Sequence, residues 1–322
     1  MRYLLRSILL AISFILMLSG ALHAQEELIN QTFENITDLN IGTVSGDCII
    51  EAGTGDEIVV NLVYQYSPTG CFEPELEQNG SQLRLSERFR QARDCNGYSE
   101  WTITVPSRIN VDVSSASGSI SLTGCEGEHS LESASGRIEV EDCQGDFEID
   151  NASGRVEITN SDGEFNIDNA SGRVRMQNVS GSFTVDNASG DVVVANARGD
   201  FSIDNASGDI DAVDMTIEGR SNFDTASGDV TLMLAQSPGY DLILDSASGD
   251  VELNYGGNGV VGFFEFTAQA DRGRIISPYQ FDNEEEFWRG TTLYERKSFT
   301  MGEGEPTIRL RTTSGRAVLE LD

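Results

Sequence analysis

The tripeptide Ala-Ser-Gly recurs at a fixed interval through the middle of this chain of 322 residues. Weaker copies, Val44-Ser45-Gly46 and Thr313-Ser314-Gly315, stand near the two ends. A fixed period of this length indicates an array in which one structural unit stacks on the next. The glycines of the regular copies lie 18 residues apart, and the last two follow after 20 and 21 residues: Gly118, Gly136, Gly154, Gly172, Gly190, Gly208, Gly228 and Gly249.

Each 18-residue unit consists of two nine-residue halves with the same pattern. Apolar residues stand two and four positions after the repeat glycine, and again eleven and thirteen positions after it. This alternation is typical of a half-buried strand, and the Gly, Asn, Asp and Ser residues between the apolar pairs favour turns. Glycine every nine residues excludes a helix. The columns predicted to form the core include Val156, Ile158, Phe165, Ile167, Val174, Phe183, Val185, Phe201 and Ile203.

The pattern predicts an all-β fold, a two-sided β-solenoid with about 18 residues per coil, coils about 4.8 Å apart and right-handed winding. Valine and isoleucine would line one inner face, and phenylalanine with isoleucine the other. Small residues seven and sixteen positions after the glycine would lie inside the narrow edges. An antiparallel meander of nine-residue units is the alternative, but it leaves unexplained why phenylalanine recurs every 18 residues. We expect an N-terminal β region at 25–115, the regular solenoid at 116–255 and aromatic-rich C-terminal coils at 256–322.

Residues 1–24 have the features of a signal peptide. Arg2 and Arg6 precede an apolar run, and small residues lead up to Ala24. We expect cleavage after Ala24, no transmembrane span in the mature chain, and export to the periplasm, the outer surface or the extracellular space. A retained membrane anchor is the alternative, although the apolar run is short for a span.

The charge of the chain restricts its partners and its chemistry. Lys and Arg total 21 against 53 Asp and Glu, a formal charge of −32. Nucleic acid and anionic lipid surfaces both require a basic footprint, so neither is an expected partner. Only two histidines occur, and His23 lies in the signal segment. We interpret the other, His129, as a half-exposed residue at the end of the phenylalanine column and not as a general base.

The five cysteines carry three separate expectations. A Cys71–Cys95 disulfide would close the polar excursion at 67–98, as suits an exported chain. Cys48 stands at an inward position and is expected to be a buried free thiol. Cys125 and Cys143 occupy the same column on adjacent coils, so we expect a second bridge between them. No spacing of zinc type is present.

Two outward columns are candidates for function. Asp150, Asp168, Asp186 and Asp204 form one, beside a column of Asn151, Asn169, Asn187 and Asn205. Turn chemistry is one interpretation of these columns, and weak calcium binding by stacked carboxylates is the other. We expect no cofactor, with calcium as the alternative. The second column reads Arg137, Arg155, Arg173 and then Asp191, Asp209, Asp229 and Asp250, either a solvated face or a stripe that recognises a partner.

The run Trp-Thr-Ile-Thr-Val-Pro-Ser-Arg-Ile-Asn-Val-Asp-Val-Ser-Ser-Ala-Ser-Gly at 101–118, the repeated Ala-Ser-Gly units and the closing Ile-Arg-Leu-Arg-Thr-Thr-Ser-Gly at 308–315 form one pattern. It resembles the bacterial "putative adhesin" domain family over roughly 35–322. The resemblance implies a β-solenoid-like fold and an envelope or extracellular location, and it carries no catalytic residues. This chain departs from simpler members in its cysteine-bearing loop and its aromatic stretch.

That aromatic stretch, at 255–300, breaks the repeat and contains Trp288. We interpret it as a cap over the open end of the solenoid, with a ligand-binding surface as the alternative. The whole pattern favours a non-enzymatic envelope or surface protein, an adhesin or interaction scaffold whose partner is an envelope polymer or protein. The candidate partner surface comprises Arg137, Arg155, Arg173 and Trp288. A β-helix polysaccharide lyase or hydrolase and a calcium-dependent module are the alternatives.

Overall fold

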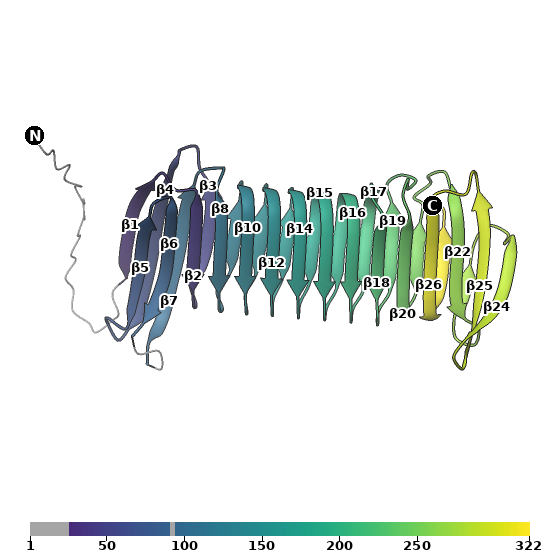
Figure 1. Cartoon of the computed structure of the whole chain (residues 1–322). Helices are drawn as coiled ribbons and strands as arrows, with labels where there is room; N and C mark the ends of the chain where they lie inside the picture. The colour runs from purple at the N-terminus through teal and green to yellow at the C-terminus, as the bar shows by residue number, and fades with distance from the viewer. Residues whose placement is uncertain (1–25, 91–93) are drawn as a thin grey trace, which may run out of the picture.

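The computed structural model describes residues 26–90 and 94–322, which form 27 β-strands and no helix. The strands wind into one elongated stack of coils (Figure 1). The all-β solenoid predicted from the repeat is confirmed, whereas its right-handed winding and the three region boundaries stay predictions. The proposed signal segment, 1–24, lies outside the described residues. Nothing in the described part of the chain forms a helix long and apolar enough to cross a membrane.

In the regular region, most coils consist of two strands, whereas β15 and β16 each run through a coil as one strand of 14 residues. Each strand pairs in parallel with the same strand of the next coil, so that Val156 faces Val174 and Phe165 faces Phe183. The strands are β9 (Ile120–Thr123), β10 (Glu126–Ser133), β11 (Ile138–Glu141), β12 (Gln144–Asn151), β13 (Val156–Thr159), β14 (Asp162–Asn169), β15 (Val174–Asn187), β16 (Val192–Asn205), β17 (Ile210–Ile217), β18 (Ser221–Thr225), β19 (Val230–Leu234), β20 (Leu242–Ser248) and β21 (Val251–Asn254).

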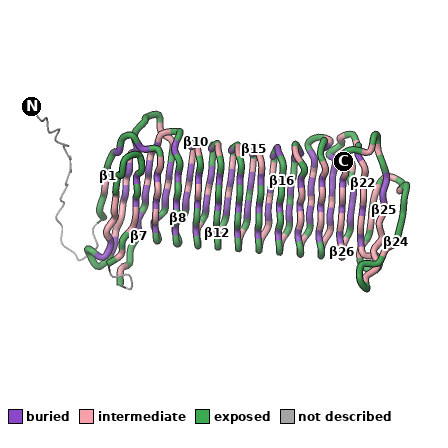
Figure 2. The backbone as a smooth tube through the Cα atoms, in the orientation of Figure 1, coloured by how far each residue is buried: buried purple, intermediate pink, exposed green. Residues whose placement is uncertain are grey.

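The core is a set of columns that run along the axis. All nine predicted core residues from Val156 to Ile203 are buried, and buried positions alternate with more exposed ones along most strands of the regular coils (Figure 2). The rings of Phe147, Phe165, Phe183 and Phe201 stack nearly parallel, with centroids 4.5, 5.2 and 5.1 Å apart. The repeat glycines also stack on one another. They lie so close together that a Cβ on Gly172 would collide with the carbonyl oxygen of Gly154.

The two narrow edges differ, and two expectations about them were wrong: the alanines do not lie inside, and the asparagine column does not face outward. At one edge the small residues seven after the glycine are buried, as Cys143 and Ser161 are. At the other edge the asparagines are buried, and the alanines beside them are exposed. The period of two carries Phe, Ile and Asn of the long strand to the same side, so asparagine takes the inner place. The amide NH2 group of Asn169 is satisfied there, because its Nδ2 donates to Asn187 Oδ1 at 2.8 Å. The buried Oδ1 of Asn169 has no hydrogen-bond partner within the described chain.

At the N-terminal end, the order of coils in space departs from their order in the chain. Strand β2 pairs in parallel with both β6 and β8, and β3 pairs with both β7 and β9. The coil of β2 and β3 therefore lies between two later coils, and β4 with β1 covers the outer one in antiparallel pairing. The strands are β1 (Glu27–Glu34), β2 (Asp38–Thr43), β3 (Asp47–Ala52), β4 (Glu57–Ser67), β5 (Phe72–Asn79), β6 (Gln82–Phe89), β7 (Asn96–Val105) and β8 (Asn110–Ser115).

The C-terminal end repeats this arrangement. Strand β26 is inserted between β20 and β22, and β27 between β21 and β23, so the chain ends inside the stack and not at its tip (Figure 1). An antiparallel pair, β25 and then β24, covers the edge of β22. The strands are β22 (Gly262–Gln269), β23 (Arg274–Ile276), β24 (Asn283–Arg289), β25 (Thr292–Met301), β26 (Thr307–Ser314) and β27 (Arg316–Glu320).

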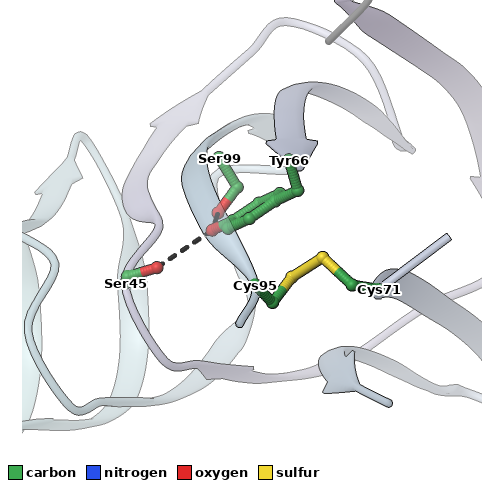
Figure 3. Close-up of a disulfide and its surroundings, with 5 residues drawn as sticks. All are labelled: Ser45, Tyr66, Cys71, Cys95 and Ser99. Carbon is green, nitrogen blue, oxygen red and sulfur yellow. Dashed lines mark hydrogen bonds between the residues drawn. A yellow bond between two sulfur atoms is a disulfide. The ribbon is translucent and has the colours of Figure 1, made fainter. Parts of the chain in front are cut away.

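The predicted Cys71–Cys95 disulfide is present in the N-terminal region, with Cα atoms 5.6 Å apart (Figure 3). Near it, the hydroxyls of Ser45 and Tyr66 lie 2.9 Å apart, and Tyr66 also contacts Ser99 at 3.2 Å. These contacts tie the weak repeat copy at 44–46 to strands β4 and β7. Cys48 is a buried free thiol, as expected.

The second predicted bridge, Cys125–Cys143, is not formed. The two residues do occupy one column on adjacent coils, because Gln144 N donates to Cys125 O at 2.9 Å. Both thiols are free and buried, and the Cys143 sulfur instead accepts from Cys125 N at 3.4 Å. The column also holds Ser161, Val179 and Ala197, so a small buried side chain is what the position requires.

Candidate functional site

A row of seven carboxylates runs along one face of the stack. Each belongs to one coil, and strand pairing places each beside the next. The exposed alanines at the same edge form the other wall of a groove of about 700 Å³. We call this line of side chains the carboxylate row; it consists of Glu132, Asp150, Asp168, Asp186, Asp204, Asp224 and Asp245.

Repulsion between the side chains from Glu132 to Asp224 of the carboxylate row is not balanced by ion pairs within the described chain. Among the described residues, no ion pair involves the row from Glu132 to Asp224. Partial burial, and then repulsion by Asp168, Glu148 and Glu132, raises the pKa of Asp150. Burial followed by repulsion from Asp224 and Asp186 does the same for the pKa of Asp204. The described chain contains no group of three or more His, Cys, Asp or Glu side chains placed to hold a metal ion.

The Arg-to-Asp column, here the turn column, lies at the Ala-Ser-Gly turns. Its arginines are exposed but paired: Arg137 with Glu139 at 2.6 Å, Arg155 with Glu157 at 3.2 Å and Arg173 with Asp191 at 2.9 Å. The aspartates that follow have a structural task, because each accepts a hydrogen bond from the backbone N–H of the next turn. The distances are 2.8 Å from Asp229 N to Asp209, 2.7 Å from Asp250 N to Asp229 and 2.7 Å from Arg316 N to Asp250.

His129 is buried, contrary to the expectation that it is half-exposed. It is 2% exposed, pairs with Val111 of β8 and stacks on Phe147 with ring centroids 4.9 Å apart. Strand β8 adds a further coil, and its Val111 covers His129 on the side away from Phe147, so His129 does not lie at the end of the stack. Neither ring nitrogen has a hydrogen-bond partner within the described chain, and burial lowers the pKa of His129 to about 4. An uncharged imidazole that is enclosed by the protein cannot contact a substrate.

At the C-terminal end of the carboxylate row, arginines lie on the neighbouring strands. Asp245 of β20 pairs with Arg311 of β26, which is followed across the sheet by Thr267, Arg296 and Glu285. These strands frame a cavity of about 140 Å³. We call it the hairpin pocket; its lining residues are Asp245, Glu265, Thr267, Phe287, Arg289, Tyr294, Arg296, Arg311, Thr312 and Thr313.

The hairpin pocket combines guanidinium groups with an aromatic wall. The rings of Phe287 and Tyr294 stack with centroids 5.7 Å apart. Arg296 lies 4.6 Å from the Phe287 centroid, and Arg289 lies 5.5 Å from that of Tyr294. Burial and then repulsion by Asp224 raise the pKa of Asp245 to about 6, against an opposing effect of Arg311 and Arg289. Trp288 is 67% exposed and points to the opposite side of β24 from Phe287.

Sequence reasoning missed the hairpin pocket. Its residues come from five separate strands, β20, β22, β24, β25 and β26, and β26 reaches the others only by insertion between β20 and β22. One signal was available in the chain: eight of the 21 basic residues fall within 272–316, namely Arg272, Arg274, Arg289, Arg296, Lys297, Arg309, Arg311 and Arg316.

Comparison with known proteins identifies one family. The family model described as Toastrack DUF4097 matches residues 34–272, well over half of the chain. No curated protein matches the chain.

Three solved structures are similar at low identity. A "putative cell adhesion protein" from Clostridium sporogenes is 11% identical, with 92% of this chain and 100% of that chain covered and a TM-score of 0.22. A "putative adhesin" from Bacteroides fragilis is 10% identical, covering 92% and 97%, with a TM-score of 0.31. Another from Parabacteroides distasonis is 9% identical, with the same coverage and a TM-score of 0.37. Likeness at this level carries no argument about function.

Proposed function

The chain belongs to the Toastrack DUF4097 family, and we propose that it is a non-enzymatic exported protein of the cell envelope or surface that serves as an interaction scaffold. Its partner would be an envelope polymer or protein, which it meets in the periplasm, at the outer surface or outside the cell. The signal-like segment at 1–24 and the Cys71–Cys95 disulfide support export, because disulfides persist in oxidising compartments.

The carboxylate row is the observation that carries this proposal. Seven acidic side chains stand in one line at the spacing of paired strands, about 4.8 Å. Partial burial, and then repulsion by neighbouring carboxylates, raises the pKa values of Asp150 and Asp204. Both effects disfavour the charged row unless a partner relieves them. Functional surfaces often retain such unfavourable arrangements because a partner relieves them. A partner with evenly spaced cationic or hydroxyl groups fits a row of evenly spaced acceptors.

Retention of the purified mature chain on immobilised envelope extract tests the proposal. Replacing Asp168, Asp186 and Asp204 together by Asn should abolish retention. The matched control replaces three exposed acids outside the row, Glu51, Glu57 and Glu141, by Gln and removes the same charge. Equal retention of the two variants would contradict a role for the row.

A carbohydrate-active enzyme is the second candidate, because Asp245 has a pKa near 6 and lies in a cavity. Release of reducing ends from a polysaccharide panel would establish it, provided that Asp245→Asn abolishes the release. Retention on envelope extract without release of reducing ends agrees with the scaffold.

A further inference from the structure

We propose that the hairpin pocket binds a single carboxylate-bearing sugar residue, so that the C-terminal end of the stack recognises an acidic polysaccharide. This inference rests on the proposed function, since it names a ligand class for one end of the scaffold. It concerns β20, β22 and β24–β26 and is independent of the carboxylate row from Glu132 to Asp224.

The pocket holds more donors than its own acceptors satisfy. Glu265 lies 3.4 Å from Arg309, 3.8 Å from Arg296 and 3.9 Å from Arg311, contacts too loose for good hydrogen bonds. The Nε atoms of Arg296 and Arg309 have no hydrogen-bond partner within the described chain. No ion pair of Arg289 occurs among the described residues. Those two Nε atoms are enclosed by the protein, whereas Arg289 lines the pocket and is exposed. A guanidinium carries five N–H donors in a planar fork that matches a carboxylate, so an added carboxylate would pair with Arg289.

The charge of the pocket favours a monoanion. The lining includes three arginines, Arg289, Arg296 and Arg311, and two carboxylates, Asp245 and Glu265. With every group charged, the balance is one positive charge, in a chain whose formal charge is −32. A sugar carboxylate carries one negative charge at neutral pH, whereas a phosphate monoester carries nearly two. Of these two, the carboxylate is the ligand that neutralises the site.

The remaining walls suit a sugar ring. The stacked pair Phe287 and Tyr294 offers an apolar surface beside the guanidinium groups, and Thr267 with Thr313 offers hydroxyls. Small-ligand sites commonly combine an aromatic wall with a few polar groups that fix orientation. A volume of about 140 Å³ lies well below the roughly 300–1,000 Å³ of a drug-sized site, so it admits one residue of a polymer and not several.

The direction of entry follows from the charge on either side. The carboxylate row leads away from Asp245 on one side and would repel an acidic chain. Beyond Arg296 the sheet ends at β24, whose outer edge is unpaired among the described strands and open. An acidic polysaccharide therefore approaches from the tip of the stack, with its terminal residue in the pocket.

Isothermal titration of the full mature chain with D-glucuronate and with a glucuronate-terminated oligosaccharide tests the site. Arg289→Gln should weaken binding at least about tenfold, because a hydrogen bond to a charged group is lost. Arg289→Lys keeps the charge without the fork and should be intermediate. The control is Arg155→Gln, an exposed arginine of the turn column, which should bind like the wild type. Arg289 is exposed, so all variants should fold, as melting temperatures will show.

Three results would overturn the assignment: unchanged binding by Arg289→Gln, equal binding of D-glucose, or equal competition by inorganic phosphate, which would make the recognised anion a phosphate. Failure of this inference is distinguishable from failure of the scaffold proposal. If envelope extract still retains the wild type and Arg289→Gln equally, the scaffold stands and the sugar site falls. If envelope extract retains neither protein while glucuronate binds only the wild type, the sugar site stands and the scaffold proposal falls.

Discussion

The regular coils and the two ends of this molecule pair their strands in different ways. In the middle, each strand meets the strand one repeat later, so the order in space equals the order in the chain. At both ends a later coil lies outside an earlier one or inserts beside it, and antiparallel strands cover the outermost edge. A solenoid must cover its last coil, because an open coil exposes both core and unpaired backbone.

The middle and the two ends of the stack also differ in how their charged side chains are paired. The caps carry paired charges, such as Lys297 with Glu284 at 3.0 Å and Arg90 with Glu73 at 2.6 Å. From Glu132 to Asp224, the carboxylate row has no such partner among the described residues. Strong pairing along the backbone allows the coils to carry a line of like charges, whereas the caps depend on local side-chain contacts. We therefore expect the free energy of unfolding to depend mainly on core packing in the middle of the stack. Towards the ends, we expect it to depend more on the disulfide and on the protonation of single side chains.

The largest effect should come from the phenylalanine column of the middle. Phe165→Ala and Phe183→Ala should each lower the free energy of unfolding by about 3–5 kcal/mol, because both rings are buried and stacked on two neighbours. Asn166→Ala, one position along and exposed, should change it by less than about 0.5 kcal/mol. Urea unfolding measures all three, and a similar loss at Asn166 would refute the assignment of faces.

At the N-terminal end, the cross-link should matter more than any single contact. Replacing Cys71 and Cys95 together by Ser should lower the free energy of unfolding by about 3 kcal/mol, the loop-entropy value for a sequence separation of 24 residues. The same pair of changes at Cys125 and Cys143 is the control, since those thiols are free. A reducing agent should lower the melting temperature of the wild type but not of the Cys71/Cys95 variant. No response of the wild type would contradict the cross-link.

The difference between middle and ends also explains how far sequence reasoning reaches. A period of 18 residues determines the partner of Phe165 without any structure, because a parallel stack allows one register only. The polarity of Asn169 suggests an outward position, but the period of two places it inside, where it is buried. The amide-to-amide bonds that join Asn169, Asn187 and Asn205 depend on atomic positions that composition does not indicate.

The ends could not be predicted in the same manner. Nothing in the local sequence of 307–314 indicates that β26 inserts between β20 and β22, since the weak copy at Gly315 shows only that another coil exists. The hairpin pocket depends on that insertion, because it brings Arg311 beside Asp245. Likewise, the buried state of His129 depends on β2 and β8 extending the face beyond the regular repeat.

His129 should make the N-terminal side of the regular stack sensitive to acid. Its pKa is about 4 in the folded chain against about 6.5 in an unfolded one. The unfolded state therefore takes up a proton first, and stability is lost as the pH falls from about 6.5 to 4, by about 3 kcal/mol at most. His129→Phe, which continues the Phe147 column, should remove this loss. Melting temperatures at pH 8 and pH 4.5 decide; an unaltered pH dependence in the variant would contradict the buried neutral imidazole.

Asp245 should act in the opposite direction at the other end. Its folded pKa of about 6 exceeds the ordinary value, so its contribution favours the folded chain at low pH and is lost as the pH rises from about 4 through 6. Because a third of this side chain is exposed, we expect only about 1 kcal/mol. Asp245→Asn should therefore be more stable than the wild type at pH 8 and equal to it at pH 4. Greater destabilisation at pH 8 would show instead that Arg311 dominates its environment.

The smallest expected effect is the response of the carboxylate row to salt. The Debye length falls from about 30 Å at 0.01 M salt, several coil spacings, to about 3 Å at 1 M, less than one spacing of about 4.8 Å. Melting temperature should thus rise with NaCl, by an amount equivalent to roughly 1 kcal/mol or less. Replacing Asp168, Asp186 and Asp204 by Asn should flatten this rise, because the gaps between the remaining charges widen. The Glu51, Glu57 and Glu141 to Gln variant, which removes the same net charge elsewhere, should retain most of it. An equal flattening in both would mean that net charge, and not the line of carboxylates in the middle of the stack, sets the salt dependence.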